Sequence, residues 1–164
     1  MKKELFADEY FNIWILLSHV RKAIFRAQEK ELLRHDITPE QAEALFCIQV
    51  IGDNVTPTAL SRCIIREPHT TAGLVRRMEE KDLLRRTKDL PRKNMVRVEL
   101  TEKGKQAYKI SSRRESMHKI MSCLSARELR QLRKILEKLR DNAFSELGIS
   151  GEALWPPPLV KMIS

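Results

Sequence analysis

The residues with the clearest chemical potential are small polar and basic side chains near the middle of the chain. From Pro68 the sequence carries small polar residues first, and then Arg76 and Arg77. Small side chains let a helix approach base edges closely, and arginine binds guanine or phosphate oxygens. This order suits a helix that enters the major groove of DNA. The contacts expected from it are His69, Thr70, Thr71, Gly73, Arg76 and Arg77.

A second basic cluster lies in the loop 88–94, between two strand-like segments at 83–87 and 95–100. The later segment alternates polar and apolar residues, which is typical of a strand with one buried face. A basic loop of this kind can reach a neighbouring minor groove, where negative potential attracts arginine. The expected contacts are Arg86, Arg92 and Lys93, with Asp89 pairing with Arg92 across the turn because a carboxylate does not bind phosphate.

Two short helices are needed to position these side chains. Pro57 and Pro68 mark their starts, because proline at the first helical position gives up no intrahelical hydrogen bond. Thr56 can cap the first helix with its hydroxyl. In the second helix, one core-facing stripe is formed by Thr71, Leu74, Val75 and Met78. Helix, turn, helix and hairpin in this order predict a winged helix-turn-helix unit over residues 38–103.

The remaining elements follow from caps and periodicity. A capping box at Thr38 predicts a helix over residues 39–51, and Val55 is expected to form a brief strand beside the hairpin. After the hairpin, one helix is predicted from residue 102 to residue 121. A second capping box at Ser125 predicts a further helix with a leucine-rich face.

Three motifs resemble the MarR family of bacterial transcriptional regulators. They are Arg77-Met78-Glu79, the pair Asp89 and Arg92, and Leu100-Thr101-Glu102-Lys103-Gly104. The resemblance covers residues 8–145 and implies a mainly α fold with a small β-wing, in a single MarR-type domain over residues 1–164. The sequence departs from the family pattern at Gly73, where many relatives carry a basic residue, at Asp82, which replaces a usual glycine, and at Ser61, which replaces a usual alanine.

Both ends of the chain are expected to be dimerisation helices, at residues 7–35 and 104–147. In the first, apolar side chains surround nearly the whole helix over one half of its length, so it must be buried on two sides. One chain this short covers one side, and a second copy would cover the other, which predicts a homodimer. The tail 148–164 contains Trp155-Pro156-Pro157-Pro158, which cannot be helical. We expect it either to lie along the dimer surface or a neighbour, or to be a disordered end.

The resemblance also implies control by a small aromatic molecule, since aromatic acids or phenols bind members of the family between the dimerisation helices and the winged domain. The corresponding positions here are Phe11, Trp14, Ile15, His19, Arg21 and Phe46. The alternative is that these residues are ordinary core, and the sequence leaves both readings open.

Composition narrows the functional classes. A net charge of +9 over 164 residues favours a polyanionic partner, with nucleic acid first and an anionic membrane second. No apolar run approaches the ~20 residues that cross a bilayer, and no secretory leader is visible, so we expect a cytoplasmic protein without a membrane partner. The cysteines at positions 47, 63 and 123 show no pairing pattern.

Enzymatic and metal-dependent functions have little support. The histidines at positions 19, 35, 69 and 118 are scattered, and no HExxH, GxSxG or glycine-rich phosphate loop is present. We therefore expect no enzyme activity, no metal and no cofactor beyond a possible small aromatic effector.

The sequence thus predicts a homodimeric, sequence-specific regulator of transcription that binds double-stranded DNA at a pseudo-palindromic operator as a ligand-responsive repressor. The alternative is a winged helix that acts as an adaptor, binding nucleic acid without reading sequence or binding another protein. Competition between an operator and random duplex would separate the two, because an adaptor would bind both equally.

Overall fold

The computed structural model describes residues 8–53, 55–88 and 96–149. The wing-tip residues Asp89, Arg92 and Lys93, and the tail segment Trp155–Pro158, lie outside these ranges. In chain order the elements are α1 (Glu9–Leu32), the short 3-10 helix η1 (Leu33–His35), α2 (Pro39–Ile51), α3 (Pro57–Cys63), α4 (Pro68–Glu80), β1 (Leu84–Thr87), β2 (Arg97–Leu100), α5 (Glu102–Ser111), α6 (Glu115–Met121) and α7 (Ala126–Glu146). The predicted class, mainly α with a small β-wing, is confirmed.

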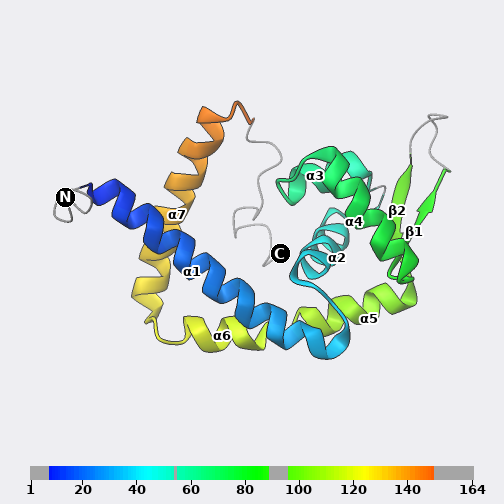
Figure 1. The fold of residues 1–164 in the computed structure, drawn as a ribbon, viewed down its shortest axis with the longest axis horizontal. Coiled ribbons are helices and arrows are strands. Elements are labelled where there is room, and N and C mark those ends of the chain that lie inside the picture. The colour runs from blue at the N-terminus through cyan, green and yellow to red at the C-terminus, as the bar shows by residue number, and fades with distance from the viewer. Residues whose placement is uncertain (1–7, 54, 89–95, 150–164) are drawn as a thin grey trace, which may run out of the picture.

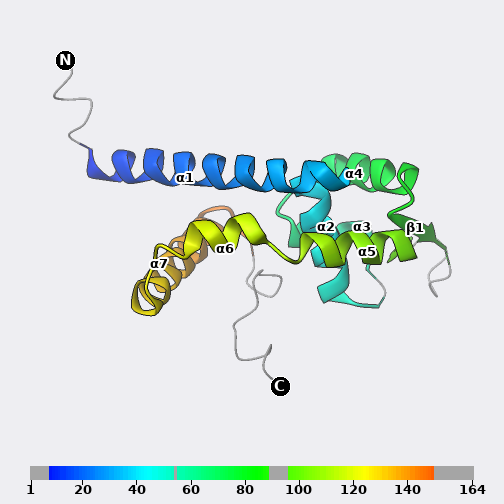
Figure 2. The ribbon, with the colours of Figure 1, turned by 90° about the horizontal axis from the view of Figure 1, so that it is seen from below.

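The chain is divided into two regions in space. Helices α2 to α5 and the β1–β2 hairpin gather at one end of the molecule, while α1 and α7 extend away from them toward the other end (Figure 1). Figure 2 shows α1 as one long helix that reaches from the N-terminal end to the helix-turn-helix region. None of the helices in the three described ranges combines the length and the apolar character needed to span a bilayer.

Side-chain caps fix most helix starts, as the sequence predicts. Thr38 forms a full capping box with Gln41 at the start of α2. Ser125 forms a second box with Glu128 at the start of α7. Thr56 accepts a hydrogen bond from the Ala59 N–H at 3.1 Å and starts α3. These bonds satisfy N–H groups that an isolated helix start would leave open to water.

The core lies under the helix-turn-helix. Leu45, Leu60 and Met78 have no exposed surface, and they bring α2, α3 and α4 together. The hairpin packs on this core through Leu84 and Val98, which are also buried. Its register pairs Leu84 with Leu100 and Thr87 with Arg97. The Val98 N–H also donates to the Val55 carbonyl at 2.7 Å, so Val55 lies beside the hairpin as predicted, although the structure assigns it to no strand.

The single helix predicted over residues 102–121 is wrong. The structure breaks it into α5 and α6 at Arg114, whose φ of 51° is left-handed. Arg114 offers no side-chain cap to α6; instead Glu31 of α1 accepts hydrogen bonds from the N–H groups of Glu115 at 3.0 Å and Ser116 at 2.8 Å. The Arg114 guanidinium also lies 4.7 Å from the centre of the Phe46 ring. Contacts from distant parts of the chain therefore hold the break, and helical periodicity cannot reveal them.

Two of the cysteines lie together although their spacing gives no sign of it. The thiols of Cys47 in α2 and Cys63 in α3 are hydrogen-bonded, and Cys47 is buried. This bond and burial raise the pKa of the Cys47 thiol, whereas the bond lowers the pKa of the Cys63 thiol. Both cysteines are free thiols that belong to the packing of α2 against α3.

Candidate nucleic-acid interface

Helix α4 has one buried face and one exposed face. Leu74, Val75 and Met78 are at most 2% exposed, so the side of the helix that they occupy is sealed against the core. The opposite side presents His69, Thr70, Ala72, Arg76, Arg77 and Glu80 as exposed residues. The exposed side begins with small or polar side chains and continues with two arginines, which is the arrangement that a major-groove helix needs.

Thr71 does not belong to the exposed side. Its side chain is fully buried, and its hydroxyl donates to the Glu67 carbonyl at 3.2 Å within the helix. The expectation of a DNA contact by Thr71 is therefore wrong, because DNA could reach it only after the core had opened. Its place in the apolar stripe with Leu74 and Val75 is the correct interpretation.

The two arginines of α4 differ in their surroundings. Arg76 forms an ion pair with Glu80 one turn later, at 3.6 Å, with both side chains largely exposed. Arg77 makes no ion pair with any residue that the structure describes, and its guanidinium lies beside Gly73. A surface pair of this kind is worth at most ~1 kcal/mol, so Arg76 can exchange Glu80 for phosphate at little cost. Arg77 needs no such exchange.

Arg86 has a structural partner that the sequence does not show. Its guanidinium binds the Glu79 carboxylate, with the Nη2 atom 2.6 Å and the Nε atom 2.8 Å from Oε2. The Glu79 Oε1 atom also accepts the Arg86 backbone N–H at 3.2 Å. These hydrogen bonds lower the pKa of Glu79 and raise that of Arg86. Arg86 thus ties strand β1 to the end of α4. Its side chain is half-exposed, so any contact that it makes with DNA must be compatible with its pairing to Glu79.

The wing strands carry a further set of paired charges. Glu99 of β2 binds Arg85 at 3.0 Å and Arg97 at 2.8 Å. Arg97 also donates to the Thr87 hydroxyl at 3.3 Å, across the hairpin. These contacts keep the base of the wing in one geometry. Lys88 is the last described residue before the loop, and it is exposed.

The start of α4 has backbone N–H groups that no side chain of the described residues caps. Glu67 occupies the cap position but its side chain makes no capping hydrogen bond, in contrast to Thr56 at α3 and Thr101 at α5. The Thr71 N–H already reaches the Glu67 carbonyl. Helix starts carry partial positive charge and favour anions. The exposed start of α4, next to His69 and Thr70, is therefore suited to a phosphate group.

The net charge is distributed differently from what the composition suggests. Residues 38–103 contain twelve lysines and arginines against ten acidic residues, a difference of +2. Residues 104–149 contain eleven against five, a difference of +6. Most of the excess therefore lies on α5, α6 and α7 and not on the winged unit. The total of +9 is weak evidence for the DNA surface, which rests on the local geometry of α4 and the wing.

The six residues expected to hold an effector do not meet within one subunit. Phe11 and Trp14 stack with ring centres 5.7 Å apart near the start of α1, where both are exposed. Phe46 lies under Arg114, beside the far end of α1 where Glu31 caps α6. Glu31 follows Phe11 by twenty positions, which is about 30 Å along the helix. Ile15, His19 and Arg21 lie along α1 between these ends, so a site that uses all six would need a second copy.

Comparison with known proteins settles the family. No protein-family model matches the chain. A helix-turn-helix-type transcriptional regulator of Bacillus subtilis (strain 168), YsmB, is 29% identical over 127 residues, covering 76% of this chain and 86% of YsmB. The organohalide-sensing transcriptional regulator RdhR, in its 2,4-dichlorophenol-bound form, is 30% identical, with a TM-score of 0.78 over 84% of this chain and 82% of RdhR. RdhR is a MarR-family regulator. The chain belongs to the MarR family.

A solved structure of MarR itself has the same fold as this chain. A mutant of MarR from E. coli, complexed with operator DNA, gives a TM-score of 0.73 over 81% of this chain and 99% of its own, at 21% identity. The family resemblance of the sequence is thus confirmed, as is the place of this MarR-family chain among DNA-binding regulators of transcription. The roles of individual residues on α4 and the wing stay predictions.

Gly73 gives a prediction that separates folding from DNA binding. A β-carbon at Gly73 would meet only the Arg77 Nη1 atom, at an ordinary 3.5 Å. The variant Gly73→Ala should therefore raise the free energy of unfolding by about 0.5–1 kcal/mol, because alanine is the better helix former. The same methyl group would hold the helix off the base edges and lower the affinity for cognate DNA. Chemical denaturation measures the free energy of unfolding, and fluorescence anisotropy measures the affinity for DNA. A lower free energy of unfolding for Gly73→Ala would show that a β-carbon is not accommodated beside Arg77.

Proposed function

We propose that this protein is a homodimeric repressor that binds a pseudo-palindromic operator and releases it when a small aromatic molecule binds. The observation that carries the proposal is the division of the chain into two surfaces. One is the polar face of α4 beside the wing, which has open donors. The other is an apolar surface on α1 and α7, which nothing in the described part of the chain covers.

The DNA contact would follow from the first surface. His69, Thr70 and Arg77 would enter the major groove, while Lys88 and the loop after it would follow the backbone toward the minor groove. Several phosphate contacts make binding fall steeply with salt, at a log–log slope of about 0.9 per phosphate neutralised. An adaptor that binds only phosphates would show the same slope but no preference between cognate and random duplex.

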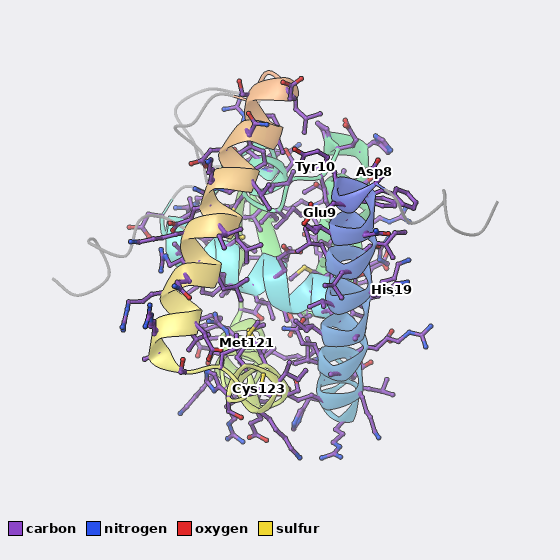
Figure 3. All side chains as sticks on the ribbon, turned by 90° about the vertical axis from the view of Figure 1, so that its left-hand side faces the viewer. Asp8, Glu9, Tyr10, His19, Met121 and Cys123 are labelled. Carbon is purple, nitrogen blue, oxygen red and sulfur yellow. The ribbon has the colours of Figure 1, made fainter. Side chains whose placement is uncertain are left out.

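The homodimer would follow from the second surface. Large apolar side chains at the start of α1 are exposed, with Tyr10 at 88% and Trp14 at 60%. On α7 the exposed large apolar residues are Leu129, Ile135, Leu136 and Leu139, and the cap residue Leu147 is exposed as well. Figure 3 views the molecule from this side and shows α1 and α7 in the foreground, with Tyr10 and His19 labelled on α1. An uncovered apolar surface of this extent is typical of a protein–protein interface, and a second copy provides a matching one.

Helix α7 offers a matched pair of variants for testing the dimer. Leu136 lies in the apolar stripe and Lys134 on the opposite, exposed face of the same helix. Leu136→Glu would place one charge per subunit in the interface and should weaken dimerisation at least about 100-fold. Lys134→Glu should leave the dimer intact. Sedimentation velocity measures both, and an unchanged mass for the Leu136→Glu protein would contradict an α7 interface.

Control by a ligand is supported by the relative RdhR, whose structure contains 2,4-dichlorophenol. For this chain the proposed effector is a phenol or an aromatic acid, bound where α1 of one subunit meets Phe46 of the other. A ligand releases DNA only when it binds the two arrangements of the dimer with different affinity. The test is a titration of 2,4-dichlorophenol and related phenols against the protein–operator complex. If the affinity for the operator never falls as phenol is added, the proposed effector control is contradicted. The DNA-binding proposal would be unaffected.

The repressor role has its own test. In a purified transcription reaction, addition of the protein should lower transcription from a promoter that overlaps its operator. An increase in transcription would show that the protein is an activator, and the proposed DNA contacts would be unchanged.

A further inference from the structure

We propose that the exposed face of α7 is a docking surface for an acidic helix of another protein. This face carries a row of exposed basic residues, here called the basic stripe, which consists of Arg127, Arg130, Lys134 and Lys138. A helix turns about 100° per residue, so the four side chains leave the axis within about 80° of one another. Leu129 and Leu136 lie on the opposite side of α7, where the proposed dimer would cover them. The basic stripe would therefore stay open in the dimer.

The two acids nearest to the far end of the basic stripe bind other cations. Glu137 pairs with Arg133 at 2.7 Å, and Asp141 pairs with Arg140 at 2.8 Å. Each of these acids also lies three positions after a lysine of the stripe, which is a spacing that permits an ion pair on a helix. The structure uses the arginines instead, and it leaves both lysines open to another partner.

None of the four cations of the basic stripe forms an ion pair with a residue that the structure describes. Glu128, the acid at the start of α7, is held by Ser125, whose N–H and hydroxyl donate to it at 2.8 Å and 2.7 Å. Neighbours along the stripe are three or four positions apart, and like charges at this spacing destabilise a helix. The stripe therefore does not stabilise α7, and an anionic partner would relieve the repulsion within it.

The spacing of the basic stripe matches a second helix. Lys138 follows Arg127 by eleven positions, which is about 16.5 Å along the axis, with steps of about 4.5–6 Å between neighbours. One face of another helix repeats its side chains with the same steps, so four carboxylates can meet four cations. An extended strand repeats side chains on one face about every 6.6 Å and falls out of register. DNA carries one phosphate per about 3.4 Å of axis on each strand, along a path that winds away from a straight helix.

The edge of the basic stripe is apolar, which also favours a protein partner. Ile135 is about 60° from Lys138 around the helix, and it is 57% exposed. An acidic helix with an apolar flank would cover this side chain, whereas a phosphate backbone would not. Helix α7 lies away from the β1–β2 hairpin in Figure 1, so a partner on the stripe and DNA on α4 would not exclude each other.

The docking surface can be tested with the full chain and two synthetic helical peptides of one composition. One peptide carries glutamates along a single face beside a row of leucines, and the other has the same glutamates distributed around the helix. Fluorescence anisotropy should show at least about fivefold tighter binding of the first peptide. Lys134→Glu should weaken that binding at least about fivefold, because an attraction becomes a repulsion. Lys109→Glu, at an exposed position of α5, is the control and should change it by less than about twofold.

Sedimentation velocity and circular dichroism check that each variant keeps the mass and the helix content of the parent. Arg130→Glu, one turn before Lys134, replaces Lys134→Glu if that protein does not fold. Equal binding of the two peptides, or equal losses in the α7 and α5 variants, would overturn the surface. If a random-sequence duplex loses at least as much affinity as the acidic peptide in the α7 variant, the stripe binds nucleic acid and the acidic-helix partner is overturned. These measurements contain no operator, so their failure would leave the proposed DNA-binding function in place.

Discussion

Replacing Arg77 with alanine should weaken binding to the cognate duplex by at least about 30-fold, because each good arginine contact with a base is worth ~1–3 kcal/mol and a two-fold dimer loses two of them. Arg77 is the arginine of α4 that makes no ion pair with a described residue, so it enters the complex without breaking a bond. Its position beside Gly73 directs the guanidinium toward the leading half of the helix. Arg76→Ala should cost less, because Arg76 must first leave Glu80.

The control for this prediction is Arg127→Ala. Arg127 is an exposed arginine of α7, and its loss removes the same charge from each subunit. Helix α7 lies away from the β1–β2 hairpin in Figure 1. Its effect on DNA affinity should stay within about threefold at moderate salt, where distant charges are screened. Fluorescence anisotropy on a labelled duplex measures both variants. Equal effects of Arg77→Ala and Arg127→Ala would mean that affinity follows total charge and not the α4 surface.

Replacing Gly104 with alanine should destabilise the fold by about 3 kcal/mol or more, because a β-carbon there has no space. It would lie 1.9 Å from the Leu83 carbonyl oxygen and 2.9 Å from the Leu83 carbonyl carbon. Leu83 cannot withdraw easily, since its N–H donates to the Met78 carbonyl at 2.9 Å and its carbonyl accepts the Thr101 N–H at 3.2 Å. The clash therefore forces α5 away from the junction of α4 and the wing.

Gly73→Ala is the matched control for Gly104→Ala, because both glycines lie within helices and only Gly104 is enclosed by backbone. Urea denaturation at a fixed protein concentration compares the two, since dimerisation makes apparent stability depend on concentration. The Gly104→Ala midpoint should fall while the Gly73→Ala midpoint rises. A Gly104→Ala protein as stable as the parent would show that α5 does not approach Leu83 in this way.

Local chemistry made much of the fold predictable. Thr38, Thr56, Thr101 and Ser125 each begin a helix where the sequence places one, because a hydroxyl cap acts within three residues of its own position. The buried stripe of α4 follows from helical periodicity in the same way. The family resemblance could be predicted because the hairpin and the helix after it supply motifs at fixed spacing, and the comparisons with known proteins confirm it.

Features that depend on distant parts of the chain were not predictable. The break before α6 needs Glu31, which precedes Glu115 by 84 positions. The pairing of Arg86 with Glu79 requires the hairpin to turn back over the end of α4. The contact between Cys47 and Cys63 arises only when α2 and α3 pack. Thr71 is a different case: its small polar side chain suggests a base contact, whereas its place in the core-facing stripe predicts the burial that the structure has.

The measurement that tests the central claim most directly is selection of bound duplexes from a random DNA library by the purified full chain. The account predicts an inverted repeat whose half-sites are centred about 10 bp apart or a multiple of that distance, bound by two subunits. Enrichment of a single asymmetric site by one subunit, or no enrichment at low salt, would contradict it.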